Sequence, residues 1–197
     1  MSPETFIFFG RSGSGKGTQA DLLGEYLKKK DPGRNVLHIE TGRRIREFLE
    51  EKSHTSELTS AVVKNGGLLP AFLPIWVWTE YLIKNFTGNE HLILDGLSRR
   101  GSEAPVFDSA LSFYGIKHPF IVPINVSREW ARDRLLARGR ADDTTMDIER
   151  RLDWYENNVV PAIEFFRSKP EYRFVEINGE QPIEKVQEDI LKGTGLE

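Results

Sequence analysis

A glycine-rich segment near the amino terminus constrains the fold more than any other stretch of the sequence. It lies between an apolar run at 6–9 and a helix-like segment at 17–30, and it reads Gly10-Arg11-Ser12-Gly13-Ser14-Gly15-Lys16-Gly17-Thr18. Glycines let backbone N–H groups curl around phosphate oxygens, the helix N-terminus adds a positive dipole, and Lys16 reaches the β- and γ-phosphates. The segment therefore predicts a Walker A phosphate loop between a strand and a helix.

The residue after Lys16 departs from the usual motif. Walker A loops carry a serine or threonine there, and its hydroxyl binds Mg²⁺. This chain has Gly17 at that position and places the hydroxyl one residue later, at Thr18. We therefore expect the hydroxyl contact to be shifted or replaced by a water molecule. A purely structural glycine-rich turn is the alternative, and the surrounding strand, spacing, lysine and helix argue against it.

Apolar runs alternate with segments of helical periodicity along the chain. Helical spacing is clearest at 17–30, 128–138 and 146–166, and Pro161 is expected to kink or interrupt the last of these because it lacks an N–H group. Five short runs rich in β-branched and aromatic residues predict strands at 5–9, 35–39, 91–94, 119–125 and 173–177. Such alternation predicts a parallel sheet with helices on both faces.

Two stretches break this alternation. Residues 41–70 hold two helix-like pieces and no strand pattern, so we expect a helical insertion after the second strand. Residues 139–145 join two helices, and at about 3.4 Å per residue they can form no more than a short lid loop. The total length of 197 residues suits a single domain that carries small appendages.

Composition and charge exclude several classes of protein. The chain contains no cysteine, which rules out thiolate nucleophiles, cysteine-ligated zinc and iron–sulfur clusters. A net charge of −3 argues against nucleic acid or an anionic membrane as a partner. No window approaches the ~18 apolar residues of a membrane span, and the first residues lack the basic segment of a signal peptide. We therefore expect a cytoplasmic protein.

A second phosphate-related motif is an apolar strand that ends in a carboxylate. Residues 92–96 read Leu-Ile-Leu-Asp-Gly, which is the pattern of a Walker B strand. Asp95, at the carboxyl end of that strand, would lie beside the phosphate loop and hold Mg²⁺ directly or through water. The alternative is that Asp95 only caps a turn or a helix.

Arginine is concentrated in the second half of the chain. Of the 27 basic residues 16 are arginines, and seven of these fall within 128–151, where there is no lysine. Phosphoryl transfer needs fixed positive charge around the moving group, and a guanidinium can hold phosphate through two parallel hydrogen bonds. The candidates for this role are Arg46, Arg99, Arg134, Arg138, Arg140 and Arg151. A surface ion pair is the alternative, and we prefer it for Arg128, Arg132 and Arg150.

Taken together, these motifs resemble those of nucleoside monophosphate kinases of the short adenylate kinase type, over nearly the whole chain. Beyond the phosphate loop, the shared segments are Thr41-Gly42 with Arg46, Gly67-Leu68-Leu69-Pro70, Asp95-Gly96-Leu97-Ser98-Arg99, Arg134-Leu135-Leu136-Ala137-Arg138-Gly139-Arg140 with Asp142-Asp143, and Arg151-Leu152 with Tyr155. The resemblance implies a P-loop NTPase-type, three-layer α/β/α fold with a five-stranded parallel sheet. It also implies a monomer with one domain over 1–197, made of a core at 1–40, 71–137 and 146–197, a monophosphate-binding insertion at 41–70 and a short lid at 138–145.

The resemblance implies roles for the residues on the donor side. Arg134 would pack on the ATP base, where a guanidinium can stack, and Asp95 would anchor the Mg²⁺ shell through water. Asp142 and Asp143 would act within the closing lid. The ATP phosphates would be held by Ser12, Gly13, Ser14, Gly15, Lys16, Gly17 and Thr18. The implied catalytic residues are Lys16, Arg99, Arg138, Arg140 and Arg151.

On the acceptor side, the resemblance implies that Arg46 and Arg99 grip the phosphate of the monophosphate, while Thr41 and Leu69 line its base pocket. The implied acceptor-binding residues are Thr41, Arg46, Leu69, Gly96, Arg99, Glu103, Arg140 and Arg151. The implied reaction is reversible transfer of the ATP γ-phosphoryl group to a nucleoside monophosphate, AMP first, with Mg²⁺ accompanying ATP. Nucleotides are thus the expected partners. A nucleotide-binding regulatory protein without turnover is the alternative of another class.

Glu103 is the departure from the family pattern that bears most on the acceptor. Adenylate kinases carry a glutamine at this position, whose amide both accepts from the adenine amino group and donates to the ring nitrogen. An ionised glutamate only accepts, so it suits the N–H donors of guanine better, and GMP, CMP or UMP are alternative acceptors. A buried, protonated Glu103 would rescue adenine, whereas a Glu103 turned to solvent would read no base.

Three further departures concern loops and charge. Ser12 and Ser98 stand where the family usually has proline, and we expect this to loosen two loops without altering the chemistry. Arg43 stands where a carboxylate is common after Thr-Gly, and it either adds positive charge near the acceptor phosphate or is a solvated helix residue. The absence of cysteine excludes a zinc-bearing lid.

Overall fold

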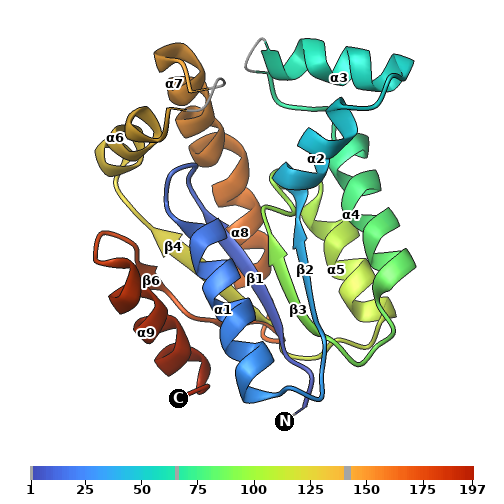
Figure 1. Cartoon of the computed structure of the whole chain (residues 1–197), viewed down its shortest axis with the longest axis vertical. Coiled ribbons are helices and arrows are strands. Elements are labelled where there is room, and N and C mark those ends of the chain that lie inside the picture. Colours follow the sequence, from blue (N-terminus) through green and yellow to red (C-terminus); the bar gives the residue numbers. More distant parts are fainter. Residues whose placement is uncertain (1, 65–66, 140–142) are drawn as a thin grey trace.

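A parallel β-sheet forms the centre of the molecule in this computed structural model, which describes residues 2–64, 67–139 and 143–197 (Figure 1). Its strands are arranged in the order β2-β3-β1-β4-β5, and β6 pairs with β4. Every registered pairing is parallel, so the predicted sheet is confirmed. The strands are β1 (Thr5–Gly10), β2 (Val36–Glu40), β3 (His91–Asp95), β4 (Phe120–Asn125), β5 (Arg173–Phe174) and β6 (Ile177–Asn178).

The helices cover both faces of this sheet, as the alternation predicts. The helices in the described part of the chain are α1 (Lys16–Lys30), α2 (Thr41–Leu49), α3 (His54–Lys64), α4 (Phe72–Asn85), α5 (Ala104–Phe113), α6 (Arg128–Arg138), α7 (Thr145–Trp154), α8 (Val160–Arg167) and α9 (Ile183–Thr194). No helix within the described residues is both long and apolar enough to cross a bilayer.

Side-chain alternation along β1 explains the three layers. Successive strand residues point to opposite faces of a sheet. Phe6 and Phe8 accordingly pack with α1 and α9 in one buried cluster, whereas Ile7 and Phe9 pack with α4, α5 and α8 in the other. All four side chains are at most 3% exposed. A strand that is buried on both faces reads as a continuous apolar run, which is why the pattern at 6–9 is so clear.

The last predicted strand and the longest predicted helix are both divided in the structure. The run at 173–177 forms two short strands, β5 and β6, each paired with β4. The segment 146–166 forms α7, a π-helix η1 (Tyr155–Val159) and α8, in which Pro161 lies in the first turn. Proline is tolerated there because the first turn has no need of its N–H. The backbone widens just before it, where Val160 N–H donates to Tyr155 C=O.

The two helical pieces expected within 41–70 are α2 and α3. They lie above the carboxyl ends of the strands, opposite α6 and α7 (Figure 1). Helix α2 packs against α4, and the rings of Phe48 and Trp76 meet edge to face with their centroids 5.3 Å apart. The end of the sheet that faces these four helices is where ligands bind in open α/β folds.

Phe166 is expected to be among the side chains on which stability depends most. It is fully buried, and its ring meets those of Phe107 at 5.9 Å and Tyr172 at 4.9 Å. Phe166→Ala should lower the free energy of unfolding by about 3–5 kcal/mol, measured by urea denaturation. Phe113 is 83% exposed, so Phe113→Ala should change it by no more than about 0.5 kcal/mol. Equal decreases in the free energy of unfolding for the two variants would contradict this packing.

Candidate active site

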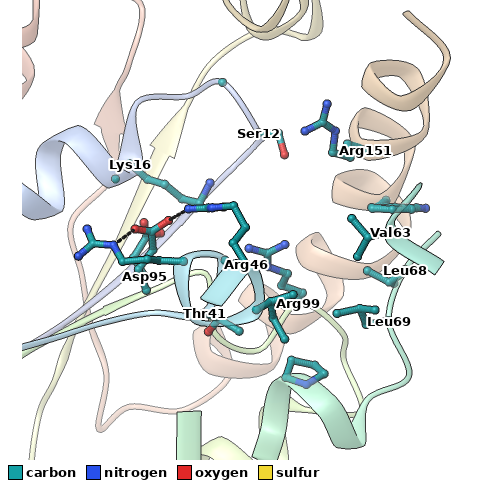
Figure 2. A pocket seen from close by; sticks show the side chains of 18 of the residues that line it. Ser12, Lys16, Thr41, Arg46, Val63, Leu68, Leu69, Asp95, Arg99 and Arg151 are labelled. Atoms are coloured by element: carbon teal, nitrogen blue, oxygen red, sulfur yellow. Dashed lines mark hydrogen bonds and ion pairs between the residues drawn. The ribbon is translucent and has the colours of Figure 1, made fainter. Parts of the chain in front are cut away.

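A cavity of about 890 Å³ lies at the carboxyl end of the sheet (Figure 2). Its wall is formed by the glycine-rich loop, the ends of β2 and β3, α2, the segment after α3, and the facing helices α6 and α7. The sequence-predicted residues that line it are Ser12, Gly13, Gly15, Lys16, Gly17, Thr18, Thr41, Arg46, Leu69, Asp95, Arg99, Glu103, Arg134, Arg138 and Arg151. Residues that are far apart in the sequence are therefore brought around one space.

Two of the predicted site residues that the structure describes, Ser14 and Gly96, do not line this cavity. Ser14 is buried in the loop, where its N–H donates to Arg11 C=O at 3.0 Å. Gly96 lines a smaller neighbouring cavity together with Arg99. Arg140 and Asp142, which were expected in the lid, lie outside the described residues.

The glycine-rich loop needs glycine at two positions. Gly13 and Gly15 have φ angles of +86° and +88°, in the left-handed region that side chains disfavour. A Cβ atom on Gly13 would also lie 2.7 Å from the Ala131 carbonyl oxygen, which is on α6. Gly15 precedes the first residue of α1, so the loop turns directly into the helix N-terminus. The strand, loop and helix thus have the order that a phosphate loop requires.

Lys16 and Asp95 form the charged floor of the cavity. Burial lowers the pKa of Lys16 and raises the pKa of Asp95, and the attraction between the two groups opposes both shifts. Asp95 is 4% exposed, and its Oδ1 is buried without a hydrogen-bond partner among the described residues. A Cβ atom on Gly17 would lie 3.4 Å from Asp95 Oδ2, so glycine there leaves the carboxylate accessible. Asp95 therefore has both the chemistry and the free coordination of a Mg²⁺ ligand.

Asp143 holds two of the predicted arginines together on the opposite wall. Arg138 donates Nε to Oδ2 at 2.9 Å and Nη2 to Oδ1 at 2.8 Å, and Arg151 donates Nη2 to Oδ1 at 2.6 Å. The Asp143 side chain is fully buried between them. Such charge-assisted, bidentate pairing fixes the orientation of a guanidinium. Arg134, one turn before Arg138, has its guanidinium carbon 5.9 Å from the centre of the Trp130 ring.

Two arginines on the α2 side converge on the backbone of Gly42. A Cβ atom on Gly42 would lie 3.4 Å from Arg46 Nη1 and 3.5 Å from Arg99 Nη2. In Figure 2 the side chains of Lys16, Arg46 and Arg99 extend into the same space. Thr41 is 2% exposed, and its hydroxyl has no hydrogen-bond partner among the described residues. The arrangement offers guanidinium groups and an unpaired hydroxyl to an anionic ligand.

The loop that carries Arg99 contains a residue with an unusual backbone conformation. Ser98 has a φ angle of +54°, which proline cannot adopt because its ring fixes φ near −65°. The loop is closed by Arg99, whose Nε donates to Gly96 C=O at 3.0 Å. Proline is therefore excluded here by the path of the backbone.

Glu103 lies inside the cavity wall. It is 2% exposed, and its Oε2 accepts a hydrogen bond from the Arg99 backbone N–H at 2.8 Å. Burial raises the pKa of Glu103, although the Arg99 N–H and the nearby guanidinium of Arg100 oppose that shift. The alternative in which Glu103 faces solvent is wrong. Its neighbour Arg100 donates Nη2 to the Leu69 carbonyl at 2.8 Å, so the loop is tied to the segment after α3.

Glu40 and Arg100 are among the residues at this site that were not identified from the sequence. Glu40 lines the cavity and is paired in register with Asp95 across β2 and β3. Arg100 supports the cavity through its contact with Leu69. A signal for Glu40 was present, because it ends an apolar strand just as Asp95 does. Arg43, for which two roles were open, also lines the cavity.

Comparison with known proteins places this site in a family. A family profile described as adenylate kinase matches residues 8–171. Adenylate kinase 1 of Nostoc sp. is 30% identical over 96% of this chain and 97% of that protein. The adenylate kinase of Porphyromonas gingivalis is 31% identical over 83% of this chain and 82% of its own, and adenylate kinase 1 of Synechocystis sp. is 30% identical over 94% of each. The chain therefore belongs to the adenylate kinase family and is a phosphotransferase.

Proposed function

We propose that this chain catalyses reversible transfer of the γ-phosphoryl group of Mg·ATP to AMP, which yields two ADP. The observation that carries the proposal is that the phosphate loop and the arginines of α2 and of the loop after β3 line one cavity. A donor and an acceptor phosphate can therefore be held side by side. In this proposal 41–70 binds the monophosphate and 138–145 acts as a short lid over a single domain.

The residues of the cavity supply positioning and charge. Lys16 would bind the β/γ-phosphates of ATP, while Arg46 and Arg99 would hold the acceptor phosphate for in-line attack. Arg138 and Arg151, fixed by Asp143, would stabilise the negative charge of the transferring group. No covalent intermediate is needed, because two substrates held in line can react directly. Closure over the site would keep water from accepting the phosphoryl group.

Asp95 is the residue that we assign to Mg²⁺. Its carboxylate is an oxygen ligand of the kind that Mg²⁺ prefers, and its buried Oδ1 is otherwise unsatisfied. Across the part of the chain that the structure describes, no group of three or more His, Asp or Glu side chains could hold a metal ion. Phosphate oxygens and water molecules would therefore complete the shell. The bound ion would neutralise charge on the β- and γ-phosphates.

Burial of Glu103 favours AMP over the other monophosphates. A carboxyl group kept protonated has one O–H donor and one carbonyl acceptor, which are the two groups that a glutamine amide offers. The raised pKa of Glu103 supports that form. The protonated group would donate to adenine N1 and accept from the adenine amino group. GMP is the second candidate, because the ionised form would accept from the N–H groups of guanine.

AMP turnover should therefore fall as pH rises through the raised pKa of Glu103. Deprotonation removes the donor to adenine N1, and we expect kcat/KM for AMP to fall about tenfold once Glu103 is ionised. Glu103→Gln donates at every pH, so the same assay on this variant should lack the fall. Titration of the AMP phosphate affects both proteins equally. Identical profiles for the two would show that Glu103 does not read adenine.

Relative turnover with the four monophosphates tests the choice of acceptor. A coupled assay of ADP production with AMP, GMP, CMP and UMP should give the highest kcat/KM with AMP. The reason is that Glu103 makes two hydrogen bonds with adenine, whereas a different base leaves buried polar groups unpaired. A higher value with GMP would contradict AMP as the acceptor while leaving the phosphotransferase assignment intact.

A further inference from the structure

We propose that Glu40 is an internal anion that occupies the acceptor-phosphate subsite and is displaced from the arginines there when the monophosphate binds. Glu40 is the last residue of β2 and directly precedes α2. Its Oε1 accepts a hydrogen bond from Arg46 Nη2 at 3.1 Å, and its Oε2 is 3.2 Å from Arg43 Nε. The inference rests on the proposed function, which assigns Arg46 to the acceptor phosphate.

The Glu40 carboxylate lies where the side chains of Arg46 and Arg99 converge. A Cβ atom on Gly42 would lie 3.6 Å from Glu40 Oε1, close to the 3.4 Å and 3.5 Å that separate it from Arg46 Nη1 and Arg99 Nη2. One carboxylate oxygen and two guanidinium groups thus surround the same stretch of backbone.

The surroundings of Glu40 are those of an anion subsite. The N-terminus of α2 carries the positive end of a helix dipole. The buried hydroxyl of Thr41, the first residue of α2, has no partner in the described part of the chain and lines the cavity. Pairing with Arg46 and Arg43 lowers the pKa of Glu40, against the effect of its burial. The carboxylate is therefore ionised at neutral pH and imitates part of a phosphate group.

A purely structural role does not account for this carboxylate. Glu40 stands at the N-cap of α2, where a side chain commonly accepts from a backbone N–H, yet it makes no such hydrogen bond. It also lies in register with Asp95, a second carboxylate of the same cavity. The two negative groups repel, and the charge of Glu40 raises the pKa of Asp95. The carboxylate is held at this position by the arginines of the cavity.

Exchange of the carboxylate for the substrate phosphate has two consequences. While the site is free, Glu40 keeps the guanidinium of Arg46 in the cavity, so little ordering is left for substrate binding. When the phosphate dianion arrives, it must replace the carboxylate on Arg46 and then lies beside a like charge. Glu40 therefore weakens ground-state binding of the monophosphate.

The test is the affinity of the complete chain for AMP, measured by titration calorimetry for the wild type and for Glu40→Gln. Removal of one neighbouring negative charge should tighten AMP binding about tenfold. Adenosine lacks the phosphate, so its affinity should not change. Glu47→Gln is the matched control, because it also removes one carboxylate charge. Glu47 is on α2 and pairs with Arg44, Nη1 to Oε2 at 3.3 Å. That variant should bind AMP like the wild type.

Two results would overturn the proposal. In one, Glu40→Gln binds AMP no more tightly than the wild type. In the other, AMP and adenosine gain equally, which would place the effect of Glu40 on the base rather than on the phosphate. The proposed function fails separately, because in this experiment it is contradicted when the wild type itself binds no AMP. In that case both proposals are contradicted. If the wild type binds AMP and Glu40→Gln has the same affinity, only the inference about Glu40 is contradicted.

Discussion

Lys16→Met is expected to lower the rate of phosphoryl transfer by about three orders of magnitude while the fold persists. Lys16 opens α1 at the mouth of the phosphate loop and lines the cavity beside Asp95. A fixed ammonium group in a partly desolvated site stabilises the charge that develops on the transferring phosphoryl group more strongly than water would. Methionine has a similar length and no charge, so the loss is electrostatic.

The control for this variant is on the same helix. Lys28 lies in the last turn of α1 with 57% of its side chain exposed, and it pairs with Glu25. Lys28→Met removes the same charge outside the cavity and should leave ADP formation within about twofold of wild type. Thermal unfolding followed by circular dichroism checks that both variants are folded. Near-normal turnover in a folded Lys16→Met variant would contradict the role of the phosphate loop.

Arg99→Ala is expected to lower kcat/KM for the acceptor about 10²- to 10³-fold. The guanidinium of Arg99 reaches the cavity next to Gly42 and is oriented by its hydrogen bond to Gly96 C=O. Removing it leaves the acceptor phosphate without one of the two groups that hold it for attack. Because Arg99 comes from the loop after β3 and not from the phosphate loop, the affinity for ATP alone should change little.

Steady-state kinetics with AMP varied at saturating ATP, together with ATP titrations, separates these effects. Arg132→Ala is the matched control, because Arg132 pairs with Glu149 on α7 and does not line the cavity. It should retain the wild-type acceptor kinetics. If Arg99→Ala lost affinity for ATP but kept kcat/KM for AMP, the assignment of donor and acceptor sides would be reversed.

The parts of the fold that sequence predicted well are those with a strong local cause. The apolar run at 6–9 is buried on both faces, so it reads clearly as a central strand. Helix α6 was predicted with its observed bounds, because Ser127 caps its start and Gly139 ends it in the left-handed conformation. The split of 173–177 into β5 and β6 follows from pairing with β4, a long-range contact without a local pattern. The π-helix η1 likewise was foreseen only as an interruption at Pro161.

For the site, residue types were predictable and their partnerships were not. Motif spacing named the loop, Asp95 and the arginines, and the structure brings most of these around one cavity. Pairing of Glu40 with Arg46 depends on where β2 ends relative to α2, which no motif records. The burial of Glu103 likewise depends on how the loop after β3 folds back to place the Arg99 N–H against it. Such contacts join separate segments, so they become visible only when the chain is folded.

The most direct test of the central claim is the stoichiometry of the reaction, followed by ³¹P NMR of the complete chain with Mg·ATP. With AMP present, two ADP should form for each ATP and AMP consumed, and the reaction should run back when ADP is supplied alone. Without AMP, ATP should persist and inorganic phosphate should not accumulate. Nucleotide binding without AMP-dependent formation of ADP would contradict the account and support a regulatory nucleotide-binding protein instead.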